Sequence, residues 1–197
     1  HYENFGGTVN PRLALVRRIR NDGAVKLIYG TAFRAPNISE LYDQDNVQFN
    51  ANPGLQPAHM SSTELLYEQG VGEHFRIRAS GFYYDIRDLI TQEKDPADDL
   101  WVYRNGGEAV GKGAEAELEG RWTGGYSGRL SYTYVVVEDK STGQRRANSP
   151  RQVAKLNASA PLPVKRFSIG LEEQYTSAQT TERGNTAAGF PVTNMTI

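Results

Sequence analysis

The sequence contains no cysteine among its 197 residues. This absence excludes disulfide bonds, cysteine-ligated zinc, iron–sulfur clusters and thiol nucleophiles. The sequence also lacks an excess of charge of one sign, because 22 Lys and Arg oppose 23 Asp and Glu and leave a formal net charge of −1. No global electrostatic attraction favours nucleic acid, and we expect no nucleic acid partner.

Long apolar runs are missing too. No stretch approaches the ~18 apolar residues of a transmembrane helix, and the mean hydropathy is −0.59. These facts leave a membrane β-barrel open, because barrel strands alternate and their average hydropathy is low. The chain opens without an initiator methionine or a signal-peptide pattern, so we expect it to be a piece of a longer protein.

Apolar and polar residues alternate with a period of two through most of the chain, which is the signal of strands with one apolar face. In Gly113–Trp122, glutamates at 115, 117 and 119 alternate with small and apolar residues, and Ala24–Phe33 alternates almost as clearly. Helical spacing is hard to find. We predict an all-β chain with further strands at 12–19, 62–71, 75–91, 126–137, 151–160 and 167–175, and a last one from about residue 190.

The connections between these strands alternate between short and long. Because every second connection of an antiparallel meander returns to the same end, the short turns are predicted at one end and the long loops at the other. Outer-membrane β-barrels are built in this way, with strands long enough to cross the hydrocarbon layer. The short connections are 21–23, 72–74, 123–125 and 161–164, and the long polar ones are 34–61, 92–112, 139–150 and 177–189.

A soluble β-sandwich or barrel is the alternative, because its strands alternate in the same way. Loops longer than ~12–15 residues are uncommon in compact soluble domains, whereas here they recur at one end. The row of Glu115, Glu117 and Glu119 suits the wet interior of a wide barrel, with the apolar face outside. Acid–base catalysis by this row is disfavoured, since period-two spacing gives the carboxylates no selected partner.

Several segments resemble, in order and spacing, those of the TonB-dependent outer-membrane receptors. The resemblance covers roughly residues 10–139, and each segment alone would be weak. In the second segment Gln56 stands where the family usually has Lys, and Ala58 follows where it usually has Glu. The segments are NPRLAL from Asn10, YGTAFRAP from Tyr29 with ELY at Glu40, NPGLQP from Asn52, GFYYDIRDLI from Gly81 and NGGEAVGKGAEAELE from Asn105.

The resemblance implies that residues 1–197 are a fragment of a barrel domain. This domain is an antiparallel meander that forms part of a large transmembrane β-barrel of the 22-stranded type. It implies a location in the bacterial outer membrane, in contact with its lipid. The family's plug domain, TonB-contacting box and terminal strands are not visible in the sequence.

The resemblance also implies active uptake of a scarce chelate, most often an iron–siderophore complex and otherwise haem or cobalamin. The energy would come from the TonB complex through the absent N-terminal region. No enzyme activity, resident cofactor or metal site is expected. Two other functions remain open at this point: a soluble binding or adhesion module, and a passive porin.

Candidate ligand-binding residues lie in the predicted long loops at 34–50 and 100–104. Arg34 and Tyr42 suit an anionic or aromatic chelate, and Trp101 and Tyr103 are expected in the middle of a loop. A structural role for Arg34, which ends an inward face before a proline, is the alternative. The candidates are Arg34, Tyr42, Asp43, Asp45, Trp101 and Tyr103.

The sequence from Asp43 to Asn46 resembles the opening of a calcium loop. However, Val47 stands where the next ligand belongs, and the turn glycine is missing. Metal binding there is therefore disfavoured.

Two local features predict backbone irregularities. Phe82–Tyr84 breaks the alternation, which predicts a β-bulge there or a strand that has left its apolar layer. Asn105, Gly107, Gly111 and Gly113 are expected to shape the return of the chain into the wall, with the glycines accepting positive φ.

Aromatic residues are expected at both ends of the wall. Trp122 and Tyr126 flank a short turn, while Tyr29 and Phe33 approach the opposite end of their strand. They suit the two aromatic girdles of a membrane barrel. Packing in a soluble core is the alternative.

We expect the complete gene product to be soluble only in detergent. The lipid-facing rows would otherwise expose an apolar patch larger than soluble monomers tolerate. Solubility tests with and without detergent check this. A detergent-free monomer with these side chains inside one closed core would contradict the assignment of the apolar face to lipid. The rows contain Leu130, Tyr132, Tyr134, Ala154, Leu156 and Ala158.

Overall fold

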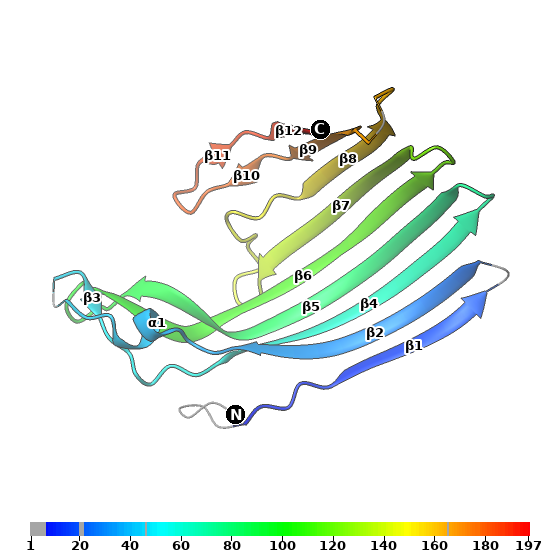
Figure 1. Cartoon of the computed structure of the whole chain (residues 1–197). Coiled ribbons are helices and arrows are strands. Elements are labelled where there is room, and N and C mark those ends of the chain that lie inside the picture. Colours follow the sequence, from blue (N-terminus) through cyan, green and yellow to red (C-terminus); the bar gives the residue numbers. More distant parts are fainter. Residues whose placement is uncertain (1–6, 20–21, 46, 165) are drawn as a thin grey trace.

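The computed structural model describes residues 7–19, 22–45, 47–164 and 166–197, which form one curved sheet with extended loops at one end (Figure 1). The sheet order is β1-β2-β4-β5-β6-β7-β8-β9-β12, so it is the antiparallel meander that the alternation predicts. These strands are β1 Arg12–Ile19, β2 Gly23–Arg34, β4 Ala58–Val71, β5 Phe75–Lys94, β6 Trp101–Arg121, β7 Ser127–Asp139, β8 Gln152–Pro161, β9 Ser168–Thr176 and β12 Phe190–Thr196.

Four small elements belong to the long loops. Helix α1 (Ile38–Tyr42) and strand β3 (Phe49–Asn50) lie between β2 and β4, and β3 pairs in parallel with β6. Strands β10 (Gln179–Thr180) and β11 (Thr186–Ala187) form a separate hairpin between β9 and β12. No helix in the described residues is long and apolar enough to cross a membrane.

Short and long connections fall at opposite ends, as predicted (Figure 1). The turns at 72–74, 122–126 and 162–167 lie at one end, and the loops at 35–57, 140–151 and 177–189 lie at the other. Residue Asn21 of the first predicted turn lies outside the described residues. Long loops are therefore confined to one end, which we call the loop end.

The predicted loop from Gln92 to Lys112 is wrong. β5 continues to Lys94 and β6 begins at Trp101, so residues 95–100 alone connect them. The neighbouring strands stop earlier, because β4 last pairs with β5 at Arg87 and β7 last pairs with β6 at Ala109. Beyond this level β5 and β6 form a two-stranded ribbon. A ribbon that leaves the sheet has no continuous apolar face, so its strands lack the alternation that marks the wall.

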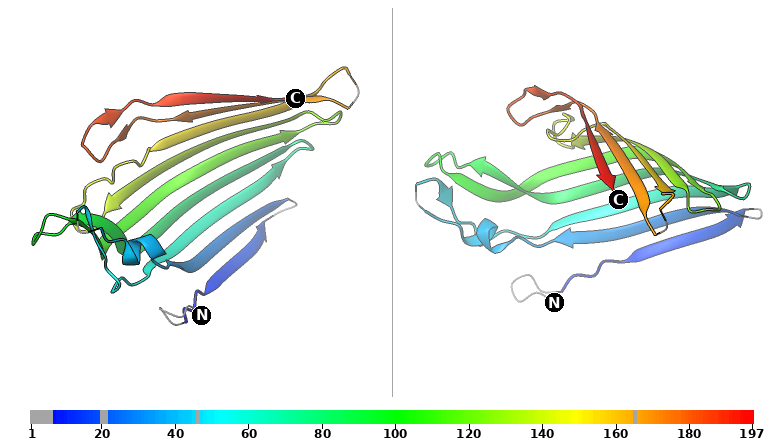
Figure 2. Two further views of the ribbon diagram at one scale, coloured as in Figure 1. Left: turned by 60° about the vertical axis from the view of Figure 1, so that its left-hand side comes forward. Right: turned by 45° about the horizontal axis from the view of Figure 1, so that its top comes forward.

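The two faces of the wall differ as expected. Residues directly opposite on antiparallel strands share a face, and Leu27, Leu65, Ala114 and Tyr134 belong to one such row with Gly81. This apolar face is open: Leu65 is 55% exposed and Tyr132 is 44% exposed. The sheet curves without closing on itself (Figure 2).

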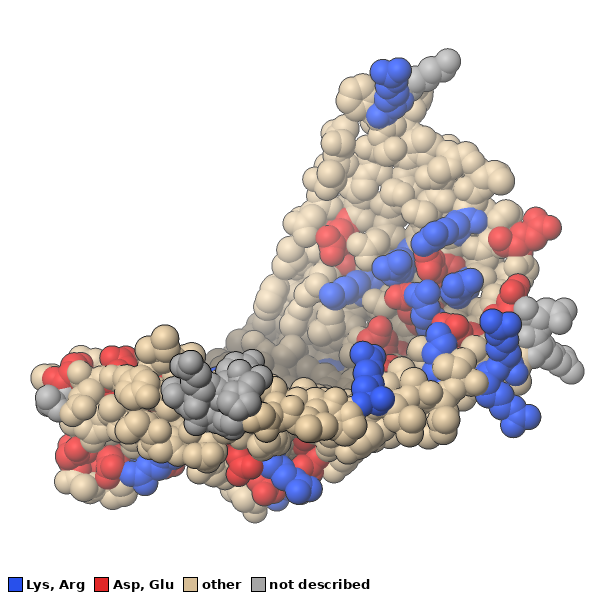
Figure 3. Space-filling model, turned by 60° about the horizontal axis from the view of Figure 1, so that its bottom comes forward, with Lys and Arg blue, Asp and Glu red and all other residues tan. Residues whose placement is uncertain are grey.

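The opposite face carries charges of both signs, interspersed along the wall (Figure 3). Glu117 pairs with Arg78, Glu119 with Arg121 at 2.6 Å, and on neighbouring strands Lys26 with Glu68 at 3.0 Å. Two members of the predicted carboxylate row, Glu117 and Glu119, are thus paired with cations, and the third, Glu115, accepts a hydrogen bond from the Thr133 hydroxyl at 3.2 Å. The row forms a polar wall surface and has no acid–base geometry.

The bulge predicted at Phe82–Tyr84 is wrong in position. β5 keeps its register with β6 from Phe75 to Ile86, and the register shifts between Ile86 and Leu89 and again between Leu89 and Ile90. Phe82 and Tyr84 interrupt the pattern because both rings lie on the polar face, where they stack with centroids 6.2 Å apart.

The predicted role of the glycines is also wrong, since Gly107, Gly111 and Gly113 are not at positive φ. They leave room instead. A Cβ on Gly111 would meet the ring of Tyr84, and one on Gly113 would meet the ring of Phe82.

Aromatic residues gather near the turn end. Trp122 lies over Gly120 and meets Phe75 edge to face, with ring centroids 5.5 Å apart. Trp122 is 41% exposed, Tyr126 51% and, higher on β2, Tyr29 42%. Half-exposed rings do not form a buried core, so core packing in a soluble domain does not describe them.

Gly113→Ala is expected to destabilise the wall by about 1–3 kcal/mol, the usual cost of overpacking. The new Cβ would collide with the carbonyl oxygen of Tyr134 on β7, which is backbone and cannot rotate away. Thermal unfolding in detergent measures the change. Gly106→Ala is the matched control, because a Cβ there meets nothing within 4 Å. Equal stability of the two variants would contradict the prediction.

Candidate functional site

The loop end begins where β2 stops. Asn37 caps α1: its side-chain oxygen accepts the Glu40 N–H at 2.8 Å, and Glu40 Oε2 accepts the Asn37 N–H at 2.9 Å. This reciprocal capping box satisfies two N–H groups that a five-residue helix would otherwise leave unpaired. Pro36 precedes the cap and ends the strand, because proline has no N–H to donate.

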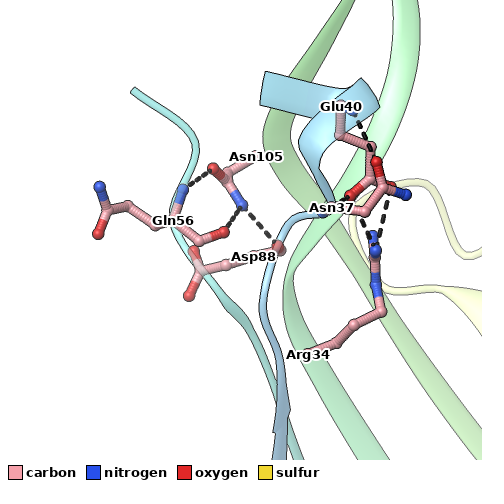
Figure 4. A network of polar contacts seen from close by, with 6 residues as sticks. All are labelled: Arg34, Asn37, Glu40, Gln56, Asp88 and Asn105. Carbon is pink, nitrogen blue, oxygen red and sulfur yellow. Dashed lines mark hydrogen bonds and ion pairs between the residues drawn. The ribbon is translucent and has the colours of Figure 1, made fainter. Parts of the chain in front are cut away.

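Arg34, the last residue of β2, lies directly below α1 (Figure 4). Its guanidinium donates to both carboxylate oxygens of Glu40, at 3.0 and 2.9 Å. The Arg34 side chain is nevertheless 51% exposed. Its charge is therefore balanced by a carboxylate on the neighbouring helix and still reaches solvent.

Asn105 joins three segments (Figure 4). Its side-chain N–H₂ donates to the carbonyl oxygens of Gln56, at 2.8 Å, and Asp88, at 2.9 Å. Its side-chain oxygen accepts the Gln56 N–H at 2.7 Å. One amide thus ties the segment before β4 to both strands of the ribbon.

The segment around β3 is fastened along β6. Trp101 donates its N–H to the carbonyl of Gln48 at 2.8 Å, and Asn52 donates its side-chain N–H₂ to the carbonyl of Tyr103 at 2.8 Å. Tyr103 packs against a buried cluster of Leu41, Leu55 and Ile90. The loop end therefore has a small core of its own.

Three of the predicted site residues lie at the C-terminal end of α1 or just after it. Tyr42 ends α1 and is 56% exposed. Asp43 caps the helix C-terminus and accepts a hydrogen bond from the Ser39 hydroxyl at 3.3 Å. Asp45 Oδ1 accepts the N–H groups of Val47, Gln48 and Phe49, at 3.0, 2.7 and 2.9 Å.

These three N–H groups lower the pKa of Asp45 below its usual value. The Asp45 carboxylate therefore stabilises this turn through hydrogen bonds to its backbone. Asn46, the last residue of the calcium-loop-like sequence, lies outside the described residues.

Trp101 and Tyr103 begin β6, where the sequence analysis places them in the middle of a loop; that placement is wrong because the ribbon extends to Lys94. Trp101 is 40% exposed, and the Lys94 Nζ lies 5.6 Å from its ring centroid. Asp99 accepts from Lys94 at 2.6 Å. An aromatic ring with an adjacent cation is thus presented near the tip of the ribbon.

The structure brings Asp45, Trp101 and Tyr103 together on one body, with Tyr42 next to its core residue Leu41, and leaves Arg34 at its base. Sequence reasoning missed Glu40 and Lys94. The spacing from Asn37 to Glu40 fits a capping box and was a usable signal for Glu40. The sequence held no comparable signal for Lys94, because its partners come from the unpredicted ribbon.

A hollow of about 660 Å³ lies at the other end of the wall. Its lining includes Glu119, Arg129, Asn157 and Glu172, on the polar face between β6 and β9. It is the inside of a curved, open sheet, and it is remote from the aromatic and cationic residues of the loop end. Among the described residues, no group of three or more His, Asp or Glu side chains is placed to hold a metal ion.

Residues 1–197 match the family model of the TonB dependent receptor-like β-barrel along their whole length. The chain belongs to this family. Members of the TonB-dependent receptor family are outer-membrane proteins of Gram-negative bacteria and are transport receptors, not enzymes; this chain accordingly belongs to the bacterial outer membrane. The alternative of a soluble adhesion module does not hold.

Solved structures of TonB-dependent receptors have the same fold. The FrpB iron transporter of Neisseria meningitidis aligns with a TM-score of 0.69 at 16% identity, over 94% of this chain and 31% of FrpB. The siderophore receptor PirA of Acinetobacter baumannii aligns with 0.76 at 13% identity, over 98% and 35%. The ferric enterobactin receptor PfeA of Pseudomonas aeruginosa, in a complex of a mutant with enterobactin, aligns with 0.76 at 16% identity, over 98% and 33%.

At these identities the likeness shows the fold alone. The chain spans about a third of the length of each of these receptors.

The turn held by Asp45 is expected to open as pH falls. Because the folded pKa is lowered, the stabilisation is complete above the ordinary value of 3.8 and is lost as pH falls through the lower folded pKa. Hydrogen exchange of the 47–49 amides, followed from about pH 5 to about pH 2, should show protection persisting below 3.8. Asp45→Asn should remove this pH dependence; protection that is lost already above 3.8 would contradict it.

Proposed function

We propose that the complete gene product is an active-transport receptor that binds a scarce chelate, most simply a ferric siderophore, at its loop end. A separate plug domain, driven by the TonB complex, would gate its passage. The match to the TonB-dependent receptor family along the whole chain carries this proposal. Several similar structures are named as receptors or transporters of iron, siderophores or copper, which supports a metal chelate as cargo.

The chemistry of the loop end supports a ligand that is both anionic and aromatic. Trp101 offers a half-exposed ring with the Lys94 ammonium beside it, and Arg34 offers a half-exposed guanidinium. Tyr42 adds a second exposed ring. Ring faces stack on aromatic ligands, and guanidinium groups bind carboxylate or catecholate oxygens in pairs.

A supporting role in the same surface is proposed for Asp43, Asp45 and Tyr103. Each has a contact within the loop end that it must keep: a helix cap, a turn and a small core. We propose that these three residues support the surface on which Arg34, Tyr42 and Trp101 meet the ligand.

Arg34→Ala, Tyr42→Ala and Trp101→Ala in the complete gene product are each expected to weaken ligand binding about tenfold, the loss of roughly 1.4 kcal/mol of contact energy. The probes are ferric enterobactin and ferric pyoverdine, the siderophores named for similar structures. Affinity of the purified receptor and uptake by cells measure the effect.

Tyr126→Ala is the matched control, because Tyr126 is 51% exposed but lies at the turn end. It should leave binding unchanged. Unchanged affinity and uptake in all three loop-end variants, for a probe that the unmutated receptor imports, would remove these residues from the binding surface. Uptake that continues without the TonB complex would identify a passive channel.

A further inference from the structure

The loop end is one body with its own internal contacts. We call residues 37–45 and 47–56 together with 89–106 the head. The buried side chains of Leu41, Leu55 and Ile90, with Tyr103 against them, come from both of its segments. Asn50 donates to Asp98 at 2.7 Å and adds a further tie between the two segments.

The head joins the wall at a level where the sheet narrows abruptly. β2 ends at Arg34, opposite the first residue of β4, and β7 ends opposite Ala109. Among the described residues, the β5–β6 ribbon alone continues above this level as paired strands of the sheet, with the short strand β3 added at its far end. A two-stranded ribbon resists bending far less than a sheet with neighbours on both sides.

All four chain crossings at this level carry a conformational break. Pro36 follows β2 and Pro57 precedes β4, where proline removes a ladder donor. β5 has its bulge here, with Asp88 in the left-handed region at φ 55°. β6 has Gly106–Gly107 opposite the bulge. Bulges bend a strand locally, so the breaks together define a line about which the head can turn.

Side-chain contacts of Arg34 and of Asn105 bridge this line. Arg34 belongs to the wall and Glu40 to the head, and their two hydrogen bonds join the two bodies. Asn105 holds the carbonyl of Asp88 across the bulge while it binds Gln56 in the opposite segment (Figure 4). Each contact has one exposed partner, since the Arg34 side chain is 51% exposed and that of Glu40 12%, and Asp88 is exposed while Asn105 is half-buried. Water can therefore reach both contacts and compete for them.

We propose that the head turns as one body on this line, and that Glu40 and Asn105 are positioning residues that set its angle to the wall. They thereby fix where Trp101 and Tyr42 lie relative to Arg34. The inference stands on the geometry of the ligand-free protein, so its test is separate from the proposed transport function.

The test is a set of distance distributions between pairs of spin labels, measured by pulsed electron resonance in the complete gene product in detergent. This chain has no cysteine, so it adds no competing labelling site. A pair of labels at Val47→Cys and Ala97→Cys, one in each segment, reports the distance between the two segments of the head. A second pair joins Ala97→Cys to Thr63→Cys, which lies at an exposed wall position of β4. The distance between these two labels reports the angle of the head to the wall.

Glu40→Gln is the decisive variant. The amide oxygen of Gln can still cap the Asn37 N–H, but the ion pair with Arg34 is lost. We expect the Ala97–Thr63 distribution to broaden about twofold, on the scale of collective hinge motions, while the Val47–Ala97 distribution stays unchanged. Asn105→Ala should broaden the former in the same way. Ser39→Ala, which removes only a contact to Asp43 inside the head, should change neither distribution.

Two results would overturn the proposal. If Glu40→Gln leaves the Ala97–Thr63 distribution as narrow as in the unmutated protein, the head is rigidly continuous with the wall. If the Val47–Ala97 distribution broadens together with it, the head is not one body. Should Asn105→Ala fail to fold, Glu40→Gln decides alone. Loss of ligand uptake in Trp101→Ala has no bearing on either distribution, so the two proposals fail separately.

Discussion

Backbone hydrogen bonding between neighbouring strands is the constraint on which this structure depends. In a wall with hydrocarbon on one side, an unpaired N–H or C=O group costs several kcal/mol, so every strand must keep a partner along its crossing. Pairing of this kind sends successive side chains to opposite faces. The chain therefore places Leu65 outside and Glu117 inside by the same rule, and the cations Arg78 and Arg129 on the polar face balance the carboxylates there.

Above the wall this constraint no longer applies, and the continuous sheet gives way to other structure there. Water can satisfy backbone groups at the loop end, so the chain is free to form a short helix, a bulge and a two-stranded ribbon. Side-chain amides then take over the role of the ladder: Asn37, Asn52 and Asn105 each pair backbone groups that no strand reaches. Asparagine suits this task because one side chain both donates and accepts.

The same division explains what the sequence could reveal. Period-two alternation arises where a sheet has one apolar and one polar face. In this chain that is the wall, so the wall strands and the placement of turns and loops follow from it. The ribbon has no continuous apolar face, so the loop predicted at 92–112 covers its strand segments at 92–94 and 101–108 together with the first wall residues of β6. Phe82 and Gly113 were each noticed, but only the register shows that one fills the space left by the other. Partners distant in sequence, such as Asn105 and Gln56, leave no local pattern.

The segments that mark the family serve mainly the scaffold. Pro36 ends β2, and Glu40 completes the capping box of α1. Leu41 and Leu55 fill the small core, and Asn105 binds the backbone of Gln56. Trp101 and Lys94 lie outside these segments, on the part of the ribbon that the scaffold holds out to solvent. A chain can therefore be assigned to the family from its framework while its cargo stays unnamed. Under the proposed transport function, cargo choice would be encoded in exposed side chains outside the framework, and the half-exposed Trp101 ring near the tip of the ribbon is such a side chain.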